Sequence, residues 1–223
     1  MNENQIHNLV KKYFSDIMEK EGLVYHKRML ILPTTEPLLR AIFFEPSGYD
    51  QERLVCTWFV QPLFVPCEYA FFNVGKRFSG WWVFTPTNEK VIANKIKNDI
   101  TFIALPALKK LYNVRKVLNF LLKSKENPDE RGDVTEYCAI WVGDKKTSKK
   151  YYNEFVDYIM YLEKRIGSVS PQLLKEKEEA KCLLDLSTKN STETRKILIK
   201  HIKYTIRNLR LPEELWFEYT KKR

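Results

Sequence analysis

The chain has 223 residues, 44% of them hydrophobic and 13% aromatic, which is enough apolar material for a folded core and excludes an intrinsically disordered protein. We expect no membrane-spanning helix, because no apolar run approaches the roughly 20 residues that a span needs. The N-terminus, MNENQIHNLVKKYF, lacks the basic start and the apolar stretch of a secretory signal, so the sequence predicts a cytoplasmic protein.

The net charge of +10 lies entirely in the second part of the chain. Residues 1–86 contain nine Lys or Arg and nine Asp or Glu, which cancel. Residues 87–223 hold the other 29 of the 38 basic residues and the other 19 of the 28 acidic residues. A neutral first part followed by a basic second part indicates two segments with different functions.

The first part of the chain has the pattern of a helix followed by a sheet. Apolar residues at helical spacing between Ile6 and Met18 predict an amphipathic helix that ends near Gly22. Three β-like runs follow, separated by turn-rich segments: 27–32, 38–45 and 53–60. Strands joined in this way pair with their sequence neighbours, so we expect an antiparallel sheet.

The stretch WFVQPLFVPCEYAFFNVGKRF, residues 58–78, interrupts an apolar strand with proline. Pro62 has no N–H for the ladder, so the strand must break or bulge there. We expect the amide of Gln61 to bond backbone groups that the break leaves unpaired. Two short strands and a glycine turn between them are predicted next: 71–74, Gly75 and 81–84.

From Thr85 onward the pattern becomes helical. Thr85-Pro86 predicts the start of one helix, and Pro106 predicts the start of another. Proline, glycine and capping residues delimit the remaining elements: a loop at 127–133, a helix at 134–142, a helix ending at Gly167, a helix capped by Ser170-Pro171, and a helix at 191–210. No fixed repeat period is visible, so we expect an irregular array of helical hairpins.

Together these patterns predict an α+β fold. An N-terminal helix packs on an antiparallel sheet of about five strands, and an all-α helical-hairpin module follows. We place the helix-plus-sheet domain at residues 1–104 and the basic all-α domain at residues 105–223.

Several short motifs in the sheet region belong to one pattern, LRxxxFExSG, then VQPLxVP, then GxR. They are Leu39-Arg40, Phe44-Glu45, Ser47-Gly48, Val60-Gln61-Pro62-Leu63, Val65-Pro66 and Gly75-Lys76-Arg77. In these motifs the chain resembles an uncharacterised bacterial family, a domain of unknown function, with Phe64 where the family has tyrosine. The resemblance covers residues 20–85 and implies a helix-plus-antiparallel-sheet fold, but it implies no activity.

The sequence offers little catalytic chemistry. Its three histidines do not stand at metal-binding spacing, and its seven glycines form no phosphate-binding loop. The four cysteines also lack a metal-type spacing, and Cys56 and Cys182 lie in apolar patterns, where a reduced thiol packs as a small hydrophobe. We therefore expect no metal, no cofactor and no catalytic residue, and we favour a protein that is not an enzyme.

Glu45, Asp50 and Glu52 surround one predicted turn, with Arg40 and Arg53 nearby. Two carboxylates of this kind hold Mg²⁺ in nucleases, but the lysine that such a site needs on a neighbouring strand is missing. The sequence therefore favours a polar turn in which Arg40 pairs with Glu45 or its neighbours.

Arg195 and His201 match the Arg-x₄₋₆-His motif of some helical ribonucleases, in which a cation and a general acid or base lie together. Lys196 stands where that motif usually has another polar residue. A match of two residues arises easily by chance, so this is the weaker of the two catalytic patterns.

The clearest functional signal is one cationic face of the predicted helix 191–210. We call it the cationic stripe, and its members are Lys196, Lys200, Lys203, Arg207 and Arg210. They advance by three or four residues, which places them on one helix face, while Leu198, Ile202 and other apolar residues lie on another. The stripe predicts binding to an acidic protein or to phosphates. The alternative is a solvated face opposite the acidic segment KEKEE, residues 175–179.

The sequence as a whole predicts a non-enzymatic cytosolic binding or accessory protein that engages an acidic protein partner. Toxin–immunity and defence-system proteins share this size and lack of catalytic motifs, which is an analogy. The alternatives are a nucleic-acid-binding protein that uses the cationic stripe and a metal-dependent nuclease.

Overall fold

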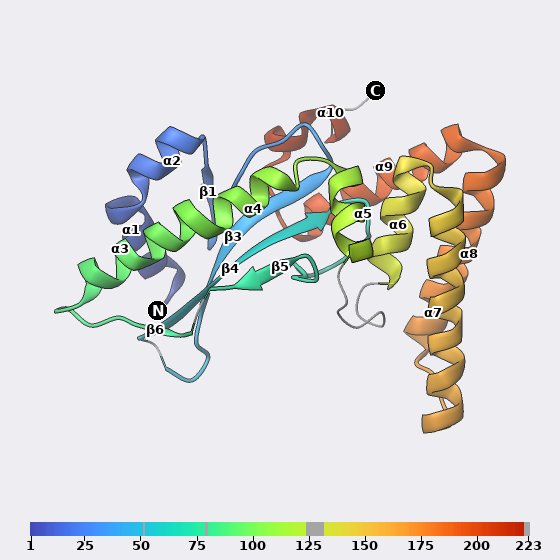
Figure 1. Cartoon of the computed structure of the whole chain (residues 1–223), viewed down its shortest axis with the longest axis horizontal. Helices are drawn as coiled ribbons and strands as arrows, with labels where there is room; N and C mark the ends of the chain where they lie inside the picture. The colour runs from blue at the N-terminus through green and yellow to red at the C-terminus, as the bar shows by residue number, and fades with distance from the viewer. Residues whose placement is uncertain (51, 79, 124–131, 221–223) are drawn as a thin grey trace. The chain divides into compact units, whose positions relative to one another are not determined.

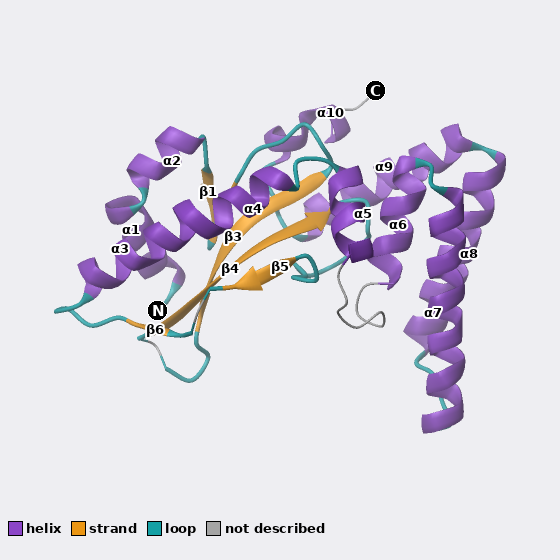
Figure 2. Cartoon of the chain, in the orientation of Figure 1, coloured by secondary structure: helices purple, strands orange, loops and turns teal. Residues whose placement is uncertain are grey.

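The computed structural model describes residues 1–50, 52–78, 80–123 and 132–220. The fold is α+β, with an antiparallel sheet, N-terminal helices and a C-terminal set of helices, as the sequence predicted (Figure 1, Figure 2). The chain divides into two compact units. Unit 1 contains residues 1–61, 70–112 and 211–223, and unit 2 contains residues 62–69 and 113–210. This division into compact units does not decide where independently folding domains begin and end. The predicted domain boundary between residues 104 and 105 therefore stays a prediction.

Unit 1 is built on a sheet with the strand order β1-β2-β3-β4-β5, and β6 pairs with another part of β4. The strands are β1 (Val24–His26), β2 (Met29–Ile31), β3 (Leu38–Pro46), β4 (Arg53–Pro62), β5 (Gly75–Arg77) and β6 (Trp82–Val83). Every residue of β4 after Arg53 is buried, so this strand provides much of the core.

The predicted strand 27–32 is shortened by a hairpin turn, and a strand that was not predicted precedes it. His26 of β1 pairs with Met29 of β2, so Lys27 and Arg28, the first two residues of the predicted run, form a two-residue turn. Lys27 has φ of 53°, the left-handed conformation that such tight turns require. Because lysine seldom adopts this conformation, the local sequence gave no sign of the turn.

Gly75 is part of a strand and not of a turn, which corrects the prediction. It pairs with Phe59 of β4, while the predicted strand 71–74 is irregular. A Cβ atom at residue 75 would lie 2.3 Å from the carbonyl oxygen of Trp58 and 2.9 Å from the Cβ of Phe59. Glycine is therefore required by the close approach of β5 to β4.

Gln61 has the role that the sequence predicted. Its side chain is fully buried, and its Oε1 accepts a hydrogen bond from the N–H of Phe71 at 3.2 Å. The residue before it, Val60, still donates its N–H to the carbonyl of Val74 at 2.7 Å. The amide of Gln61 thus satisfies a backbone donor where Pro62 stops the β4 ladder.

The helices of unit 1 are α1 (Glu3–Tyr13), α2 (Ser15–Glu21), α3 (Glu89–Asp99), the π-helical η1 (Ile100–Ala104), α4 (Leu105–Lys110), the 3₁₀ helix η3 (Glu213–Trp216) and α10 (Phe217–Thr220). Ion pairs of Lys97 with Asp16 and of Lys109 with Glu21 join the α3–α4 segment to α2. Pro106 was expected to start a new helix, but the chain stays helical from α3 to α4. Proline cannot donate to the helical ladder, and the wider π turn of η1 precedes it.

Unit 2 is helical, with α5 (Val114–Lys123), α6 (Gly132–Val142), α7 (Lys145–Ile166), α8 (Pro171–Lys189) and α9 (Ser191–Asn208). Its predicted caps are confirmed: the Ser170 side chain accepts from the N–H of Leu173, and the Asn190 side chain accepts from the N–H of Glu193. Gly167 ends α7 with φ of 78°. Most of the predicted loop 127–133 lies outside the described residues.

Substituting Gly75→Ala is expected to destabilise unit 1 by about 1–3 kcal/mol, because the new methyl group would overlap the β4 backbone. Urea unfolding followed by circular dichroism measures this change. Gly48→Ala is the matched control, since a Cβ there meets nothing within 4 Å. Equal stability of the two variants would contradict the account of Gly75.

Candidate binding surface on helix α9

Helix α9 separates two kinds of side chain onto opposite faces. Its buried residues are Thr194, Leu198, Ile202, Thr205 and Ile206. Lys196, Lys200 and Arg207 are exposed on the other side, and Lys203 is half-buried. Because the apolar face is buried in unit 2, the cationic face points to solvent.

The cations of this face are mostly not neutralised by neighbours. Lys196 pairs with Glu193 one turn earlier, at 3.1 Å. Within the described parts of the chain, Lys200, Lys203 and Arg207 form no ion pair. The acidic segment 175–179 was the proposed neutraliser, but its Glu179 pairs with Lys175 of the same helix, at 3.7 Å.

Arg210 departs from the predicted geometry. The helix ends at Asn208, and Arg210 follows it with φ of 50°, a left-handed conformation. A residue in that conformation no longer continues the helical spacing, so Arg210 does not extend the row of Lys196, Lys200, Lys203 and Arg207. Pro212 had suggested the end of the helix only to within a few residues.

A segment far away in sequence lies along the C-terminal half of α9. Thr205 Oγ1 donates to the carbonyl of Val65 at 3.1 Å, and Asn208 Nδ2 donates to the carbonyl of Cys67 at 3.4 Å. The hydroxyl of Tyr204 donates to Glu68 Oε1 at 3.4 Å. Segment 65–68 therefore places an exposed carboxylate, that of Glu68, beside the cationic face.

Sequence reasoning missed this neighbour of the stripe. Glu68 and Tyr204 are 136 residues apart, and no motif links the two positions. The nearest sequence signal was Pro62, which indicated that the chain leaves the β4 ladder there but not where it goes.

Both members of the ribonuclease-like pair contact aromatic rings. The guanidinium of Arg195 lies over the ring of Trp141, 3.2 Å from its centroid, and Trp141 also stacks on Phe64. His201 lies against Tyr137, with ring centroids 6.1 Å apart. Its Nδ1 is buried and has no hydrogen-bond partner in the part of the chain that the structure describes. His201 is half-buried, and its Nδ1 is not placed to exchange a proton with a substrate.

Burial lowers the pKa of His201, and this is the largest effect on the residue. A hydrogen bond to the backbone of Phe64 and the nearby charge of Glu179 act in the opposite direction, but they do not offset the desolvation. Folding of unit 2 therefore disfavours the protonated form of the imidazole.

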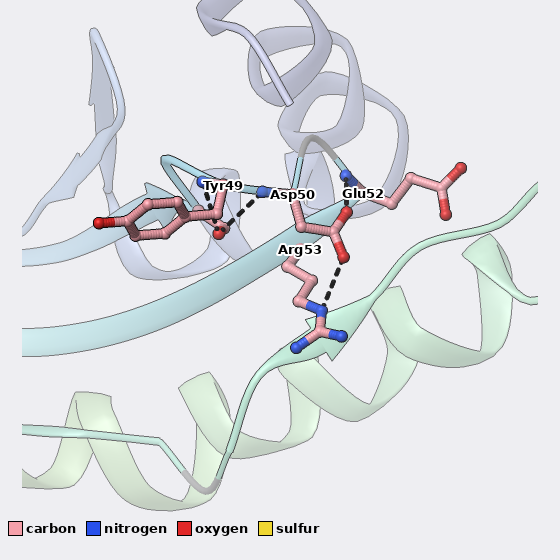
Figure 3. Close-up of polar contacts among 5 residues, drawn as sticks. Tyr49, Asp50, Glu52 and Arg53 are labelled. Carbon is pink, nitrogen blue, oxygen red and sulfur yellow. Dashed lines mark hydrogen bonds and ion pairs between the residues drawn. The ribbon is translucent and has the colours of Figure 1, made fainter.

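The acidic residues after β3 form a closed polar turn (Figure 3). Asp50 accepts from the N–H of Glu52 at 3.0 Å and pairs with the Nε of Arg53 at 2.8 Å. The hydroxyl oxygen of Ser47 accepts from the N–H groups of Tyr49 and Asp50. The carboxylate of Glu52 points away from Asp50 (Figure 3). Among the described residues, no three His, Cys, Asp or Glu side chains are placed to hold a metal ion.

Arg40 does not belong to this turn, so the predicted pairing with Glu45 is wrong. Residues 40 and 45 differ by an odd number, which puts their side chains on opposite faces of β3. The buried guanidinium of Arg40 donates to the carbonyls of Pro33 at 2.7 Å and Leu108 at 3.3 Å. Leu108 lies in the last turn of α4, where backbone carbonyls favour a cation. Glu45 pairs instead with Arg77.

The cysteines form no disulfide, and all four lie in described residues. Cys56 is buried as expected, and burial raises the pKa of its thiol. Cys182 is exposed, which corrects the prediction: α8 buries Ala180, Leu183 and Leu184, and residue 182 lies on another side of the helix.

Comparisons with protein-family models, curated proteins and solved structures find no match to this chain. The resemblance to a bacterial domain of unknown function stays a prediction. No helix in the described residues has both the length and the apolar character to cross a membrane.

The folded state is expected to lose stability as the pH falls below about 6.5, the ordinary pKa of histidine. Below that value the unfolded chain takes up a proton on His201 that the folded chain does not bind, so the free energy of unfolding decreases. Urea unfolding of the wild type and of His201→Gln at pH 7.5 and pH 5.5 measures the effect. His201→Gln should reduce the difference in the free energy of unfolding between the two pH values. An equal difference in the wild type and the variant would contradict the lowered pKa of His201.

Proposed function

We propose that this chain is a non-enzymatic binding protein that engages an acidic protein through the exposed face of α9. The observation that carries the proposal is the group Lys200, Lys203 and Arg207, which lie side by side and form no ion pair in the part of the chain that the structure describes. The cytosolic location and a place in a toxin–immunity or defence system are parts of the same proposal, and they rest on the sequence alone.

The clustering of like charges supports a binding role because it costs stability in the isolated chain. Each like-charge pair at a spacing of three or four residues destabilises a helix by about 0.2–0.5 kcal/mol. Carboxylates of a partner would relieve this repulsion. The row from Lys196 to Arg207 is about 16 Å long at the α-helical rise, which suits a short acidic helix or strand.

Nucleic acid is the alternative ligand for the same cations. Carboxylates border the row: Glu193 pairs with Lys196, and Glu68 lies next to Tyr204. Because fixed negative charges repel a phosphate backbone, the border favours an acidic protein over a nucleic acid.

The test compares two triple variants with the same change of net charge. Lys200→Glu/Lys203→Glu/Arg207→Glu reverses the α9 face, and Lys146→Glu/Lys149→Glu/Lys181→Glu reverses three exposed lysines elsewhere in unit 2. The ligands are a fluorescent 20-residue polyglutamate peptide and a random-sequence RNA or DNA duplex. Anisotropy across a range of salt concentrations measures the binding.

We expect the α9 variant to lose at least about tenfold in affinity for the acidic peptide, the effect of removing three surface charge pairs. The control variant should keep most of the affinity. Equal losses in the two variants would contradict the proposal. A different result would be that the wild type binds the duplex more tightly than the peptide, with a steep salt dependence that is lost only in the α9 variant. That result would show that the ligand of the α9 face is nucleic acid and not an acidic protein.

A further inference from the structure

We infer that Glu68 sets the specificity of the α9 face by repelling nucleic acid and by accepting one basic side chain of an otherwise acidic partner protein. The inference rests on the proposed function, since it concerns the same surface. It begins from a contrast in charge: the carboxylate of Glu68 lies beside Lys200, Lys203 and Arg207, which have no ion pair within the described residues.

Glu68 is held in place by its backbone as well as by its side chain. Val65 and Cys67 accept hydrogen bonds from Thr205 and Asn208, so the segment that precedes Glu68 is tied to successive turns of α9. The contact from Thr205 is buried, and Thr205 itself is fully buried. A carboxylate on such a segment remains near the helix whether or not a ligand is bound.

Tyr204 connects this carboxylate to the cations. It follows Lys200 by four residues and precedes Arg207 by three, so its side chain borders both on the helix surface. Its hydroxyl donates to Glu68 Oε1 at 3.4 Å, which places a negative charge at the flank of the row. Tyr204 is 44% exposed and Tyr69, next to Glu68, is 79% exposed, so two aromatic rings are accessible at the same place.

Around Tyr204 the surface has mixed chemistry: cations, the carboxylate of Glu68 and two tyrosines. Tyrosine and arginine are enriched at the energetic centres of protein interfaces. Exposed tyrosines beside cations also suit the stacking of single-stranded bases, so without Glu68 this surface would accept single-stranded nucleic acid. A fixed carboxylate acts against that ligand, and specificity in binding often depends on such a repulsive group.

The test substitutes Glu68→Gln, which removes the charge and keeps an oxygen to accept from Tyr204. Glu178→Gln on α8 is the control, because Glu178 is exposed and its substitution changes the net charge equally. The probes are a fluorescent 20-nucleotide oligothymidylate, a 20-residue polyglutamate peptide, and the same peptide with one central arginine. Binding is measured at low salt.

We expect Glu68→Gln to raise the affinity for the oligothymidylate about two- to threefold, and Glu178→Gln to change it less, because the loss of one nearby charge in water has an effect of that size. The same variant should lose the preference for the arginine-containing peptide over plain polyglutamate. Equal effects of Glu68→Gln and Glu178→Gln on both probes would overturn the inference.

The two proposals fail in different ways. If reversal of Lys200, Lys203 and Arg207 leaves polyglutamate binding intact, the proposed function is wrong. If that reversal abolishes binding but Glu68→Gln behaves as Glu178→Gln does, the face binds acidic protein and only the role of Glu68 is wrong. Wild-type binding of oligothymidylate that is tighter than binding of either peptide would also overturn the inference.

Discussion

The burial of one face of α9 is the interaction on which the functional interpretation depends. Leu198, Ile202 and Ile206 are at most 1% exposed, and a helix anchored in this way has no rotational freedom. Its opposite face is then fixed as well, so Lys200 and Arg207 are exposed beside the half-buried Lys203, and none of the three forms an ion pair with a described residue. The cations of α9 form an exposed surface only because the apolar residues of the same helix are buried.

A second constraint is the end of the β4 ladder. Pro62 cannot donate a hydrogen bond, and Gln61 satisfies the N–H of Phe71 at this point. The ladder stops, and the residues that follow belong to unit 2, where Thr205 and its neighbours bind their backbone. Pro62 thereby helps to place Glu68 beside α9, a helix that lies much later in the sequence.

Several residues of the catalytic patterns that the sequence suggested are engaged in structural contacts. Arg195 lies on Trp141, Asp50 pairs with Arg53, and Arg40 binds two backbone carbonyls. His201 presents a buried nitrogen, and its pKa is lowered by desolvation. The α9 face presents accessible charge and aromatic surface, on which the proposed function rests.

The sequence by itself determined the class of fold, several helix ends in unit 2 and the two faces of α9, because these depend on local spacing and on capping residues such as Ser170, Asn190 and Gly167. It did not determine the hairpin turn at Lys27 or the strand role of Gly75, because a left-handed lysine and a close strand approach depend on partners distant in sequence. Only the tertiary structure placed Glu68 beside Tyr204 and took Arg210 out of the helical row. Periodicity records which face of an element is buried, whereas contacts between distant segments follow from packing, which no local pattern encodes.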